Sequence, residues 1–271
     1  MRRIESRHNE RLREVARLIA SSRDRRKSGR CVLEGAHLVD VYVDRVGPPE
    51  TLVVLDDARE RVDVQALLHR VPANRTFVVT RAPFAELATS PADVGVLAVV
   101  TTPKFAASPS ARFCLLIDDV QDPGNVGSII RTAAAAGIEQ VLLSSRSAFA
   151  WAPKVLRAAQ GAHFLTNVVE DVDLVGWATS FRAARGRVFA TVVDGTRSLY
   201  DADFRGGVAV VIGSEGQGVA KALREKADES VTIPMATGTE SLNAAAATAV
   251  VLFEAVRQRR RNADPSPTAG P

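Results

Sequence analysis

The sequence is organised around residues 115–133, which read LLIDDVQDPGNVGSIIRTA. The first three of these residues form a short apolar run that is typical of a buried strand. Asp122-Pro123-Gly124 is a turn signal, and Asn125 is a suitable N-cap for the helix that the following residues predict. Because binding and catalytic groups often lie on connecting loops, we expect chemistry at this strand-to-helix connection.

Arg131 is the most distinctive side chain of the predicted helix. It shares one stripe of the helix with Gly124 and Ser128, whereas Ile129 and Ala133 lie on the opposite side. Its guanidinium therefore stands over small residues and faces open space. The plain alternative is a solvated arginine, since long charged side chains are mostly exposed.

Two later stretches change the interpretation of this helix: residues 210–218 read VVIGSEGQG and residues 233–243 read IPMATGTESLN. Together with residues 115–133 they resemble the three ordered motifs of the SpoU-type, or SPOUT-class, RNA 2′-O-ribose methyltransferases. The matching residues are Asn125, Gly127 and Arg131 in the first motif, Gly213, Glu215 and Gly218 in the second, and Ile233, Pro234, Ser241 and Asn243 in the third. The resemblance covers residues 112–260, with a weaker likeness before them.

This resemblance implies a cofactor and a place for it. In the family, S-adenosylmethionine lies in a deep C-terminal trefoil knot and is held mainly by backbone atoms of the second and third motifs. Only the resemblance supports a knot here, because true knots are rare and no periodicity reveals one. By position, the implied cofactor site consists of Thr191, Val192, Gly213, Gly218, Ile233, Met235 and Leu242.

The resemblance also implies a reaction, in which a ribose 2′-oxygen attacks the sulfonium methyl group and S-adenosylhomocysteine leaves. The implied catalytic residues are Arg131, Asn125, Glu215, Ser241 and Asn243. A guanidinium is seldom a free base, so we expect Arg131 to donate to the developing alkoxide or to the adjacent phosphate, and proton abstraction by it stays open. Glu215 could orient that guanidinium, while the amide and hydroxyl groups fix the ribose and the arginine.

Plainer explanations exist for several of these residues. The glycines of residues 213–218 match neither the dinucleotide fingerprint nor the phosphate-loop pattern, and a tight turn alone would also use them. Ser241 is a suitable N-cap for the last predicted helix. The four histidines are scattered, and no acid pair, Ser-His-Asp order or metal cluster stands out, so we expect neither hydrolytic chemistry nor a metal.

Length and composition favour a globular enzyme with two domains. The chain has 271 residues, of which 46% are hydrophobic and 24% charged. No apolar run approaches the roughly 20 residues of a membrane span, and the first residues lack the apolar core of a signal peptide. Cys31 and Cys114 lie far apart in the sequence, which favours buried thiols in a reducing compartment. We therefore expect a cytoplasmic protein.

The positive charge is concentrated at one end of the chain. Residues 1–30 hold ten arginines and one lysine against four acidic residues, a net charge of +7, which leaves −3 for the remainder. Such a cluster can hold a phosphate backbone, and the alternative is a solvated arginine-rich helix. The predicted RNA-binding residues are Arg7, Arg25, Arg26, Lys27 and Arg30.

Periodicity predicts a small α/β domain over residues 1–100. Its expected helices cover residues 9–21, 35–43, 63–69 and 82–88, its expected strands residues 31–33, 51–55, 75–79 and 94–100, and a basic connector residues 23–29. The opening Ser-Arg-His-Asn and the later Leu-Glu-Gly-Ala resemble the substrate-binding domain that precedes the catalytic domain in many ribosomal-RNA members of the family. That resemblance implies a ribosomal-protein-like α/β fold that docks RNA.

Residues 101–112, rich in Pro, Ser and Ala, are the expected linker. In residues 113–262 strands and helices alternate, which predicts a largely parallel sheet covered by helices on both faces. The strands are expected at residues 113–118, 140–143, 165–168, 187–192, 208–212 and 230–233, and the helices at residues 126–136, 153–160, 172–184, 219–226 and 242–259. The tail, residues 263–271, contains three of the chain's prolines together with the last acidic residue, and we expect it to be disordered.

Two function classes follow from these observations. The first is an active RNA 2′-O-ribose methyltransferase that uses S-adenosylmethionine, with 23S ribosomal RNA favoured over transfer RNA because of the extra domain. The second is an RNA-binding protein of the same fold without turnover. A small-molecule nucleotide enzyme would leave the basic N-terminal domain without a purpose. The family builds its active site from two chains, so the resemblance also implies a homodimer, with no membrane and no metal.

Overall fold

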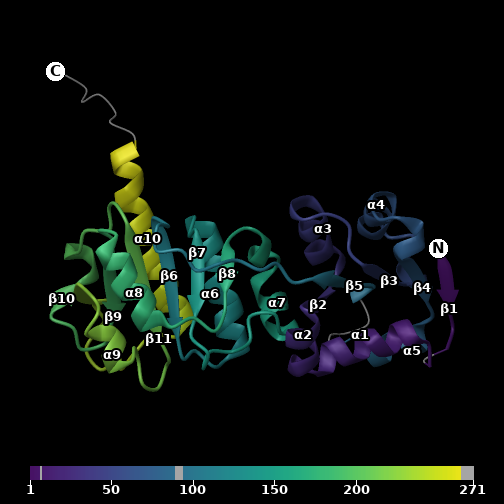
Figure 1. The fold of residues 1–271 in the computed structure, drawn as a ribbon, viewed down its shortest axis with the longest axis horizontal. Coiled ribbons are helices and arrows are strands. Elements are labelled where there is room, and N and C mark those ends of the chain that lie inside the picture. The colour runs from purple at the N-terminus through teal and green to yellow at the C-terminus, as the bar shows by residue number, and fades with distance from the viewer. Residues whose placement is uncertain (7, 89–93, 264–271) are drawn as a thin grey trace. The chain divides into compact units, whose positions relative to one another are not determined.

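We describe the protein from a computed structural model, which describes residues 1–6, 8–88 and 94–263. The chain forms two compact units (Figure 1). The first unit combines residues Met1–Lys104 with Phe149–Leu165, and the second combines Phe105–Ala148 with Thr166–Pro271. The predicted tail beyond residue 263 lies outside the described residues. The chain therefore passes from one unit to the other three times.

The first unit is built on a five-stranded mixed sheet in the order β1-β4-β3-β5-β2. Strands β1, β4 and β3 are parallel, whereas β5 is antiparallel to both β3 and β2. The strands are β1 (Arg2–Ile4), β2 (Arg30–Glu34), β3 (Thr51–Leu55), β4 (Thr76–Val79) and β5 (Val96–Thr101). The helices are α1 (Glu10–Ala20), α2 (Ser22–Ser28), α3 (Ala36–Arg45), α4 (Val62–Arg70), α5 (Arg81–Leu87) and α7 (Pro153–Ala159).

The predicted basic connector is wrong, because residues 22–28 form helix α2. The Ser21 hydroxyl accepts a hydrogen bond from the Asp24 backbone N–H, and Gly29 ends the helix in the left-handed region at φ 64°. Ser is a favoured N-cap and Gly a favoured C-cap residue, so both ends carried a signal in the sequence. The helix is only seven residues long and almost entirely polar, which hid its periodicity.

The segment 149–165 follows strand β7 of the second unit but packs within the first. Arg157 pairs at 3.2 Å with Glu34, whose side chain is only 1% exposed. Phe164 meets the ring of Tyr42 edge-on at 5.1 Å between centroids. Gly161, at φ 89°, lies so close to Val41 that a Cβ would stand 2.9 Å from its side chain. Buried contacts therefore hold α7 and its flanks to β2 and α3.

The second unit is built on a seven-stranded sheet in the order β10-β12-β9-β11-β6-β7-β8, and every strand pair in it is parallel. Its strands are β6 (Phe113–Asp118), β7 (Gln140–Leu143), β8 (Asn167–Val169), β9 (Arg187–Thr191), β10 (Arg197–Ser198), β11 (Val208–Gly213) and β12 (Glu229–Thr232). Its helices are α6 (Pro123–Ala136), α8 (Leu174–Ala183), α9 (Lys221–Arg224) and α10 (Ala244–Ala263). The predicted α/β class with a mostly parallel sheet is confirmed.

Helices cover both faces of this sheet (Figure 1). On one face α8 and α9 pack over a buried cluster that includes Trp177 and Phe181, whose rings stack at 4.8 Å. On the other face α6 and α10 pack against each other and α10 contacts β11. The central strands β6 and β11 are almost completely buried, as apolar strands of a parallel sheet should be.

Two helix starts differ from the prediction. Helix α6 begins at Pro123, and the Asp122 side chain, rather than that of Asn125, caps it by accepting from the Asn125 backbone N–H at 2.8 Å. Helix α10 begins at Ala244, and Asn243, rather than Ser241, caps it. Both corrections leave an asparagine or serine side chain available for another contact.

Both cysteines are buried free thiols, and burial raises the pKa of each to about 12. They are therefore neutral at physiological pH. Among residues 1–6, 8–88 and 94–263, no group of three or more His, Cys, Asp or Glu side chains is arranged to hold a metal ion. Within the same residues, the helices are too short or too polar to cross a membrane.

Candidate functional site

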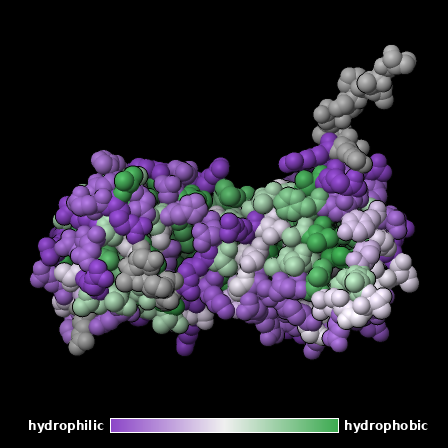
Figure 2. All heavy atoms as spheres, turned by 180° about the vertical axis from the view of Figure 1, so that it is seen from behind, coloured by the Kyte–Doolittle hydropathy of each residue, from purple (hydrophilic) through white to green (hydrophobic). Residues whose placement is uncertain are grey.

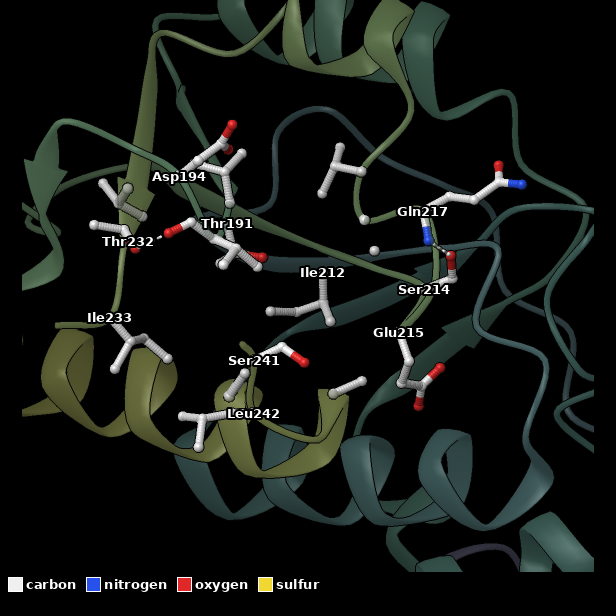
Figure 3. Close-up of a pocket in the computed structure, with 18 of the residues that line it drawn as sticks. Thr191, Asp194, Ile212, Ser214, Glu215, Gln217, Thr232, Ile233, Ser241 and Leu242 are labelled. Atoms are coloured by element: carbon white, nitrogen blue, oxygen red, sulfur yellow. Dashed lines mark hydrogen bonds between the residues drawn. The ribbon is translucent and has the colours of Figure 1, made fainter. Parts of the chain in front are cut away.

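A cavity of the second unit lies where three neighbouring strands end. Strands β9, β11 and β12 are parallel neighbours, so the loops that follow them meet at the carboxyl edge of the sheet. These loops and the segment before α10 enclose a cavity of about 380 Å³ (Figure 3). Its volume is in the usual range for a site that holds a small molecule or cofactor.

Gly213 shapes one wall of the cavity. A Cβ at Gly213 would lie 2.1 Å from the carbonyl carbon of Gly218 and 2.2 Å from the nitrogen of Val219, so only glycine fits there. The loop between them is closed by a bridge from Ser214 to Gly218, whose φ is 65°. The loop thus folds back on the end of β11, and residues 213–219 line this side of the cavity.

The lining combines apolar and polar groups (Figure 3). Ile212, Ile233 and Leu242 supply apolar surface from the end of β11 and from the segment before α10. Thr191 and Thr232 donate their hydroxyls to the backbone carbonyls of Val211 and Val193, at 2.9 Å each. These bonds hold the ends of β9 and β12 in place beside the cavity.

A chain of amide hydrogen bonds joins all three sequence motifs beside the cavity. Asn243 Nδ2 donates to Asn125 Oδ1 at 3.0 Å, and Asn125 Nδ2 donates to Glu215 Oε1. Asn243 Oδ1 accepts from the backbone N–H groups of Ala245 and Ala246, at 2.9 and 3.3 Å. The partners thus identify which amide atom is oxygen and which is nitrogen in both asparagines. The backbone N–H groups at the start of α10 fix the orientation of the Asn243 amide, which in turn fixes that of Asn125.

Arg131 lies apart from this arrangement. It is exposed on α6 and does not line the cavity. Five residues lie between it and Asn125, so it stands about 9 Å further along the helix axis at about 1.5 Å per residue. The expected contact between Glu215 and Arg131 is absent from the described residues, because Glu215 accepts from Asn125 instead. Within one chain, the described structure does not bring the arginine to the cavity.

All seven residues predicted to bind the cofactor line the cavity, namely Thr191, Val192, Gly213, Gly218, Ile233, Met235 and Leu242. Of the five predicted catalytic residues, Glu215 and Ser241 line it, and Asn125 and Asn243 reach it through Glu215. Lining residues that the sequence analysis missed include Ile212, Asp194, Arg224, Thr232 and Ala247. Their signal was positional, since most of them lie at or just beyond the ends of adjacent parallel strands or at the start of α10.

Asp118 is a further residue that the sequence analysis did not single out. It is the last residue of β6, it is only 6% exposed, and its Oδ2 accepts from the Ala220 backbone N–H at 2.8 Å. The carboxylate therefore ties the end of β6 to the chain just beyond the glycine loop. The pair of aspartates that ends the apolar run of β6 was visible in the sequence.

In the first unit the predicted RNA-binding residues have different roles. The prediction that Arg25 binds RNA is wrong. Arg25 is only 6% exposed, and its Nη1 donates to the carbonyls of Leu18 and Ile19 at 2.6 and 2.8 Å, so its guanidinium is bound to the end of α1. Burial is also the main cause that lowers the pKa of Arg25. Its guanidinium is therefore not available to a phosphate.

The other basic residues of this group are accessible to different extents. Arg30 pairs with Glu14 at 2.7 Å and with Glu50 at 3.4 Å. Arg26 lies over the ring of Phe149 at 4.4 Å, while Lys27 is exposed at the end of α2. Arg7 lies outside the described residues. Lys27 and Arg26 are thus the exposed members of this group.

A parallel α/β unit with a glycine-walled cavity at its carboxyl edge defines a class of domain that binds a nucleotide-like ligand. The family model described as SpoU rRNA Methylase family matches residues 112–253. The chain is 31% identical over 253 residues to the 23S rRNA (guanosine(2553)-2'-O)-methyltransferase RlmP of Bacillus subtilis. The alignment covers 93% of this chain and 98% of that protein. This chain therefore belongs to the SpoU rRNA methylase family.

Solved structures agree with this membership. A crystal structure of the SpoU methyltransferase AviRb from Streptomyces viridochromogenes in complex with AdoMet superposes with a TM-score of 0.82 at 29% identity, over 93% of this chain and 98% of that chain. A tRNA modifying enzyme of the TrmH/SpoU type from A. aeolicus matches with a TM-score of 0.52 at 25% identity, over 57% of this chain and 78% of that one. The likeness to AviRb spans both units, whereas the likeness to the tRNA enzyme spans little more than half of the chain.

Proposed function

We propose that this protein transfers a methyl group from S-adenosylmethionine to a ribose 2′-hydroxyl of 23S ribosomal RNA. The observation that carries the proposal is the cavity at the ends of β9, β11 and β12, where all three sequence motifs meet beside one amide hydrogen-bond chain. The relative named as a 23S rRNA methyltransferase matches over nearly its whole length, which favours ribosomal RNA over transfer RNA.

The cavity suits S-adenosylmethionine by its shape and by its donors. The close approach of Gly213 to Gly218 brings the loop backbone to the wall of the cavity, and the apolar surface of Ile212, Ile233 and Leu242 suits the flat adenine ring. Asp194, just beyond the end of β9, provides a carboxylate that can accept hydrogen bonds from the ribose hydroxyls. The bound cofactor supplies an electrophilic methyl group, which its sulfonium carries.

The amide hydrogen-bond chain positions the reacting groups. With its oxygen held by Asn243 and its nitrogen by Glu215, the Asn125 amide cannot flip without losing both bonds. Asn125 contacts Glu215, which lines the cavity, so its fixed amide can help to orient the incoming ribose, and alignment of the reacting atoms is a large part of catalysis. Ser241 adds a hydroxyl to the lining of the cavity.

We propose that Arg131 acts in the site of a second copy of the chain. It is exposed on α6 and does not line the cavity of its own chain. The exposed stripe of α10 carries apolar side chains, with Phe253 49% exposed and Ala246 and Val250 on the same stripe. Figure 2 shows hydrophobic residues gathered on the surface of the second unit. We propose a homodimer across this face, in which Arg131 of the partner subunit stabilises the developing alkoxide.

A methylation assay tests the function. Full-length protein is incubated with tritiated S-adenosylmethionine and with transcripts of 23S rRNA, 16S rRNA or a tRNA mixture. Label is expected in 23S rRNA alone, in nucleotides that resist alkaline hydrolysis because the 2′-oxygen is blocked. Label in tRNA would refute the ribosomal substrate. RNA binding without any label, at saturating cofactor, would favour the non-catalytic RNA-binding protein.

Complementation tests the shared site. An Arg131→Ala chain and an Asn125→Ala chain are each expected to be nearly inactive as homodimers. A heterodimer of the two contains one site with both native residues, so it should recover about half of the wild-type activity. No recovery would show that Arg131 acts within its own chain. Because the substrate is assembled into ribosomes, we further propose that the protein works in the cytoplasm.

A further inference from the structure

Four arginines lie together at the amino edge of the second sheet, opposite the cavity. Strands β6, β9 and β11 begin side by side there, since Val208 of β11 faces both Phe113 of β6 and Arg187 of β9. We call Arg112, Arg187, Arg205 and Arg259 the arginine cluster. Arg112 precedes β6, Arg187 opens β9, Arg205 precedes β11, and Arg259 lies near the end of α10. All four belong to the second unit.

Arg259 is anchored within the protein, but no carboxylate among the described residues pairs with it. Its guanidinium lies 4.4 Å over the ring of Phe113, and its Nη1 donates to the carbonyls of Phe204 and Gly206 at 3.3 and 2.7 Å. Carbonyl oxygens satisfy the donors but leave the full positive charge in place. The pKa of Arg259 is lowered, first by its burial and then by the charge of Arg112.

The remaining members share too few acidic partners. Asp203 pairs with Arg205 at 2.7 Å and also with Arg187 at 3.5 Å, so one carboxylate serves two guanidiniums. Glu139 accepts from the backbone N–H of Arg112 at 3.0 Å. Four arginines thus face two carboxylates, in a chain whose net charge beyond residue 30 is −3. The excess of positive charge is local.

Several arginines outside the cluster have carboxylate partners of their own. Arg70 bridges Asp40 and Asp44, and Arg197 pairs with Glu229 at 2.7 Å. Clustered like charges destabilise a folded chain unless an ion of opposite sign offsets them. A polyanion at the amino edge would remove this cost, and it would release counterions as it binds.

We propose that the arginine cluster binds the phosphate backbone of RNA. It would form a contact separate from the cavity, at the other end of the same strands. Six residues of β11 at about 3.3 Å each place the two edges about 20 Å apart, so the cluster would hold a different part of the RNA from the one that is methylated. This inference rests on the proposed function only in taking RNA as the substrate.

The test measures RNA affinity as a function of salt. The full-length triple variant Arg112→Gln, Arg187→Gln, Arg205→Gln keeps Arg259, whose contacts anchor α10. Its binding to a labelled RNA hairpin is measured by fluorescence anisotropy at several salt concentrations. Each lost phosphate contact should lower the slope of log affinity against log salt by about 0.7 to 0.9, and the affinity near 0.15 M salt by about fivefold.

Asp203→Asn should change RNA affinity in the opposite direction to the triple variant. A gain in affinity cannot result from loss of folding, so this variant separates the two explanations. Removal of the carboxylate that competes for Arg187 and Arg205 should tighten RNA binding, whereas a purely structural role for the ion pairs predicts no gain. Arg197→Gln, at a paired arginine outside the cluster, is the control and should leave the salt slope unchanged. Calorimetric binding of S-adenosylmethionine and thermal melting should match wild type for every variant.

Two outcomes overturn the inference. If the triple variant melts as wild type and keeps both the wild-type affinity and the wild-type slope, the arginine cluster does not contact RNA. If Asp203→Asn weakens RNA binding while the fold is intact, the cluster acts through its ion pairs rather than through phosphates. Neither result bears on the proposed function, which the methylation of 23S rRNA by the unaltered protein decides separately.

Discussion

Substitutions of Asn243 should separate two roles of its side chain, capping α10 and orienting the Asn125 amide. Its Oδ1 caps α10 by accepting from two backbone N–H groups, while its Nδ2 donates to Asn125. Asn243→Ala removes a cap worth about 1 kcal/mol and a hydrogen bond worth about another 1 kcal/mol. For a unit of this size about 2 kcal/mol corresponds to a melting temperature lower by about 4–8 °C.

Asn243→Ser is the matched variant. A serine hydroxyl can cap the helix, but it is too short to reach Asn125, so the variant should melt near the wild-type temperature. The Asn125 amide would then be held by Glu215 alone. Loss of one orienting bond worth about 0.5–1.5 kcal/mol should lower turnover at saturating RNA and cofactor by about 2- to 10-fold.

Differential scanning fluorimetry and single-turnover methylation measure these two effects. An Asn243→Ala protein that melts at the wild-type temperature would refute the cap as a source of stability. An Asn243→Ser protein with wild-type turnover would refute the positioning role of the amide hydrogen-bond chain. Binding of S-adenosylmethionine by calorimetry serves as the control that the cavity stays intact.

Three further predictions concern backbone packing, a buried cation and pH. Gly213→Ala should abolish cofactor binding measured by calorimetry, because its Cβ would overlap the Gly218 backbone, while Gly207→Ala, outside the cavity lining and with its nearest neighbour 3.5 Å from the Cβ, should bind normally. Arg25→Ala should lower the free energy of unfolding by about 2 kcal/mol through lost bonds to carbonyls, whereas Lys27→Ala should change RNA affinity but not melting. Burial lowers the pKa of His163 from 6.5 to about 4 in the folded protein. As the pH drops from 6.5 to 4, the unfolded chain therefore binds a proton before the folded protein does, and the free energy of unfolding should fall by about 3 kcal/mol. In urea titrations at several pH values, His163→Gln should flatten this dependence, and an unchanged slope would contradict it.

Much of the second unit was predictable from its sequence. The run of residues 113–118 and the run of residues 140–143 are apolar and short, and both became strands of the parallel sheet. Such strands are buried on both faces, so their composition alone identifies them. The cavity residues were found by a different route, since their positions came from the resemblance of three motifs and not from periodicity.

The errors arose where long-range contacts decide the local structure. Asn125 and Ser241 are good N-caps by residue type, but Asp122 and Asn243 are equally good and lie closer to the helix starts that the fold selects. Arg25 looked like its exposed neighbours until the carbonyls at the end of α1 were placed beside it. No local pattern could reveal that residues 149–165 would pack within the first unit.

The first unit is made of two separate segments of the sequence, and this affects how it folds during synthesis on the ribosome. Residues 149–165 are needed to cover Glu34 and Tyr42, yet they are synthesised more than a hundred residues later, after α6 and β7 of the other unit. The surface of the nascent first unit around Glu34 and Tyr42 therefore stays exposed while the second unit begins to form. For the same reason, cutting the chain within residues 101–112 would leave a hydrophobic patch on one fragment and the segment that covers it on the other.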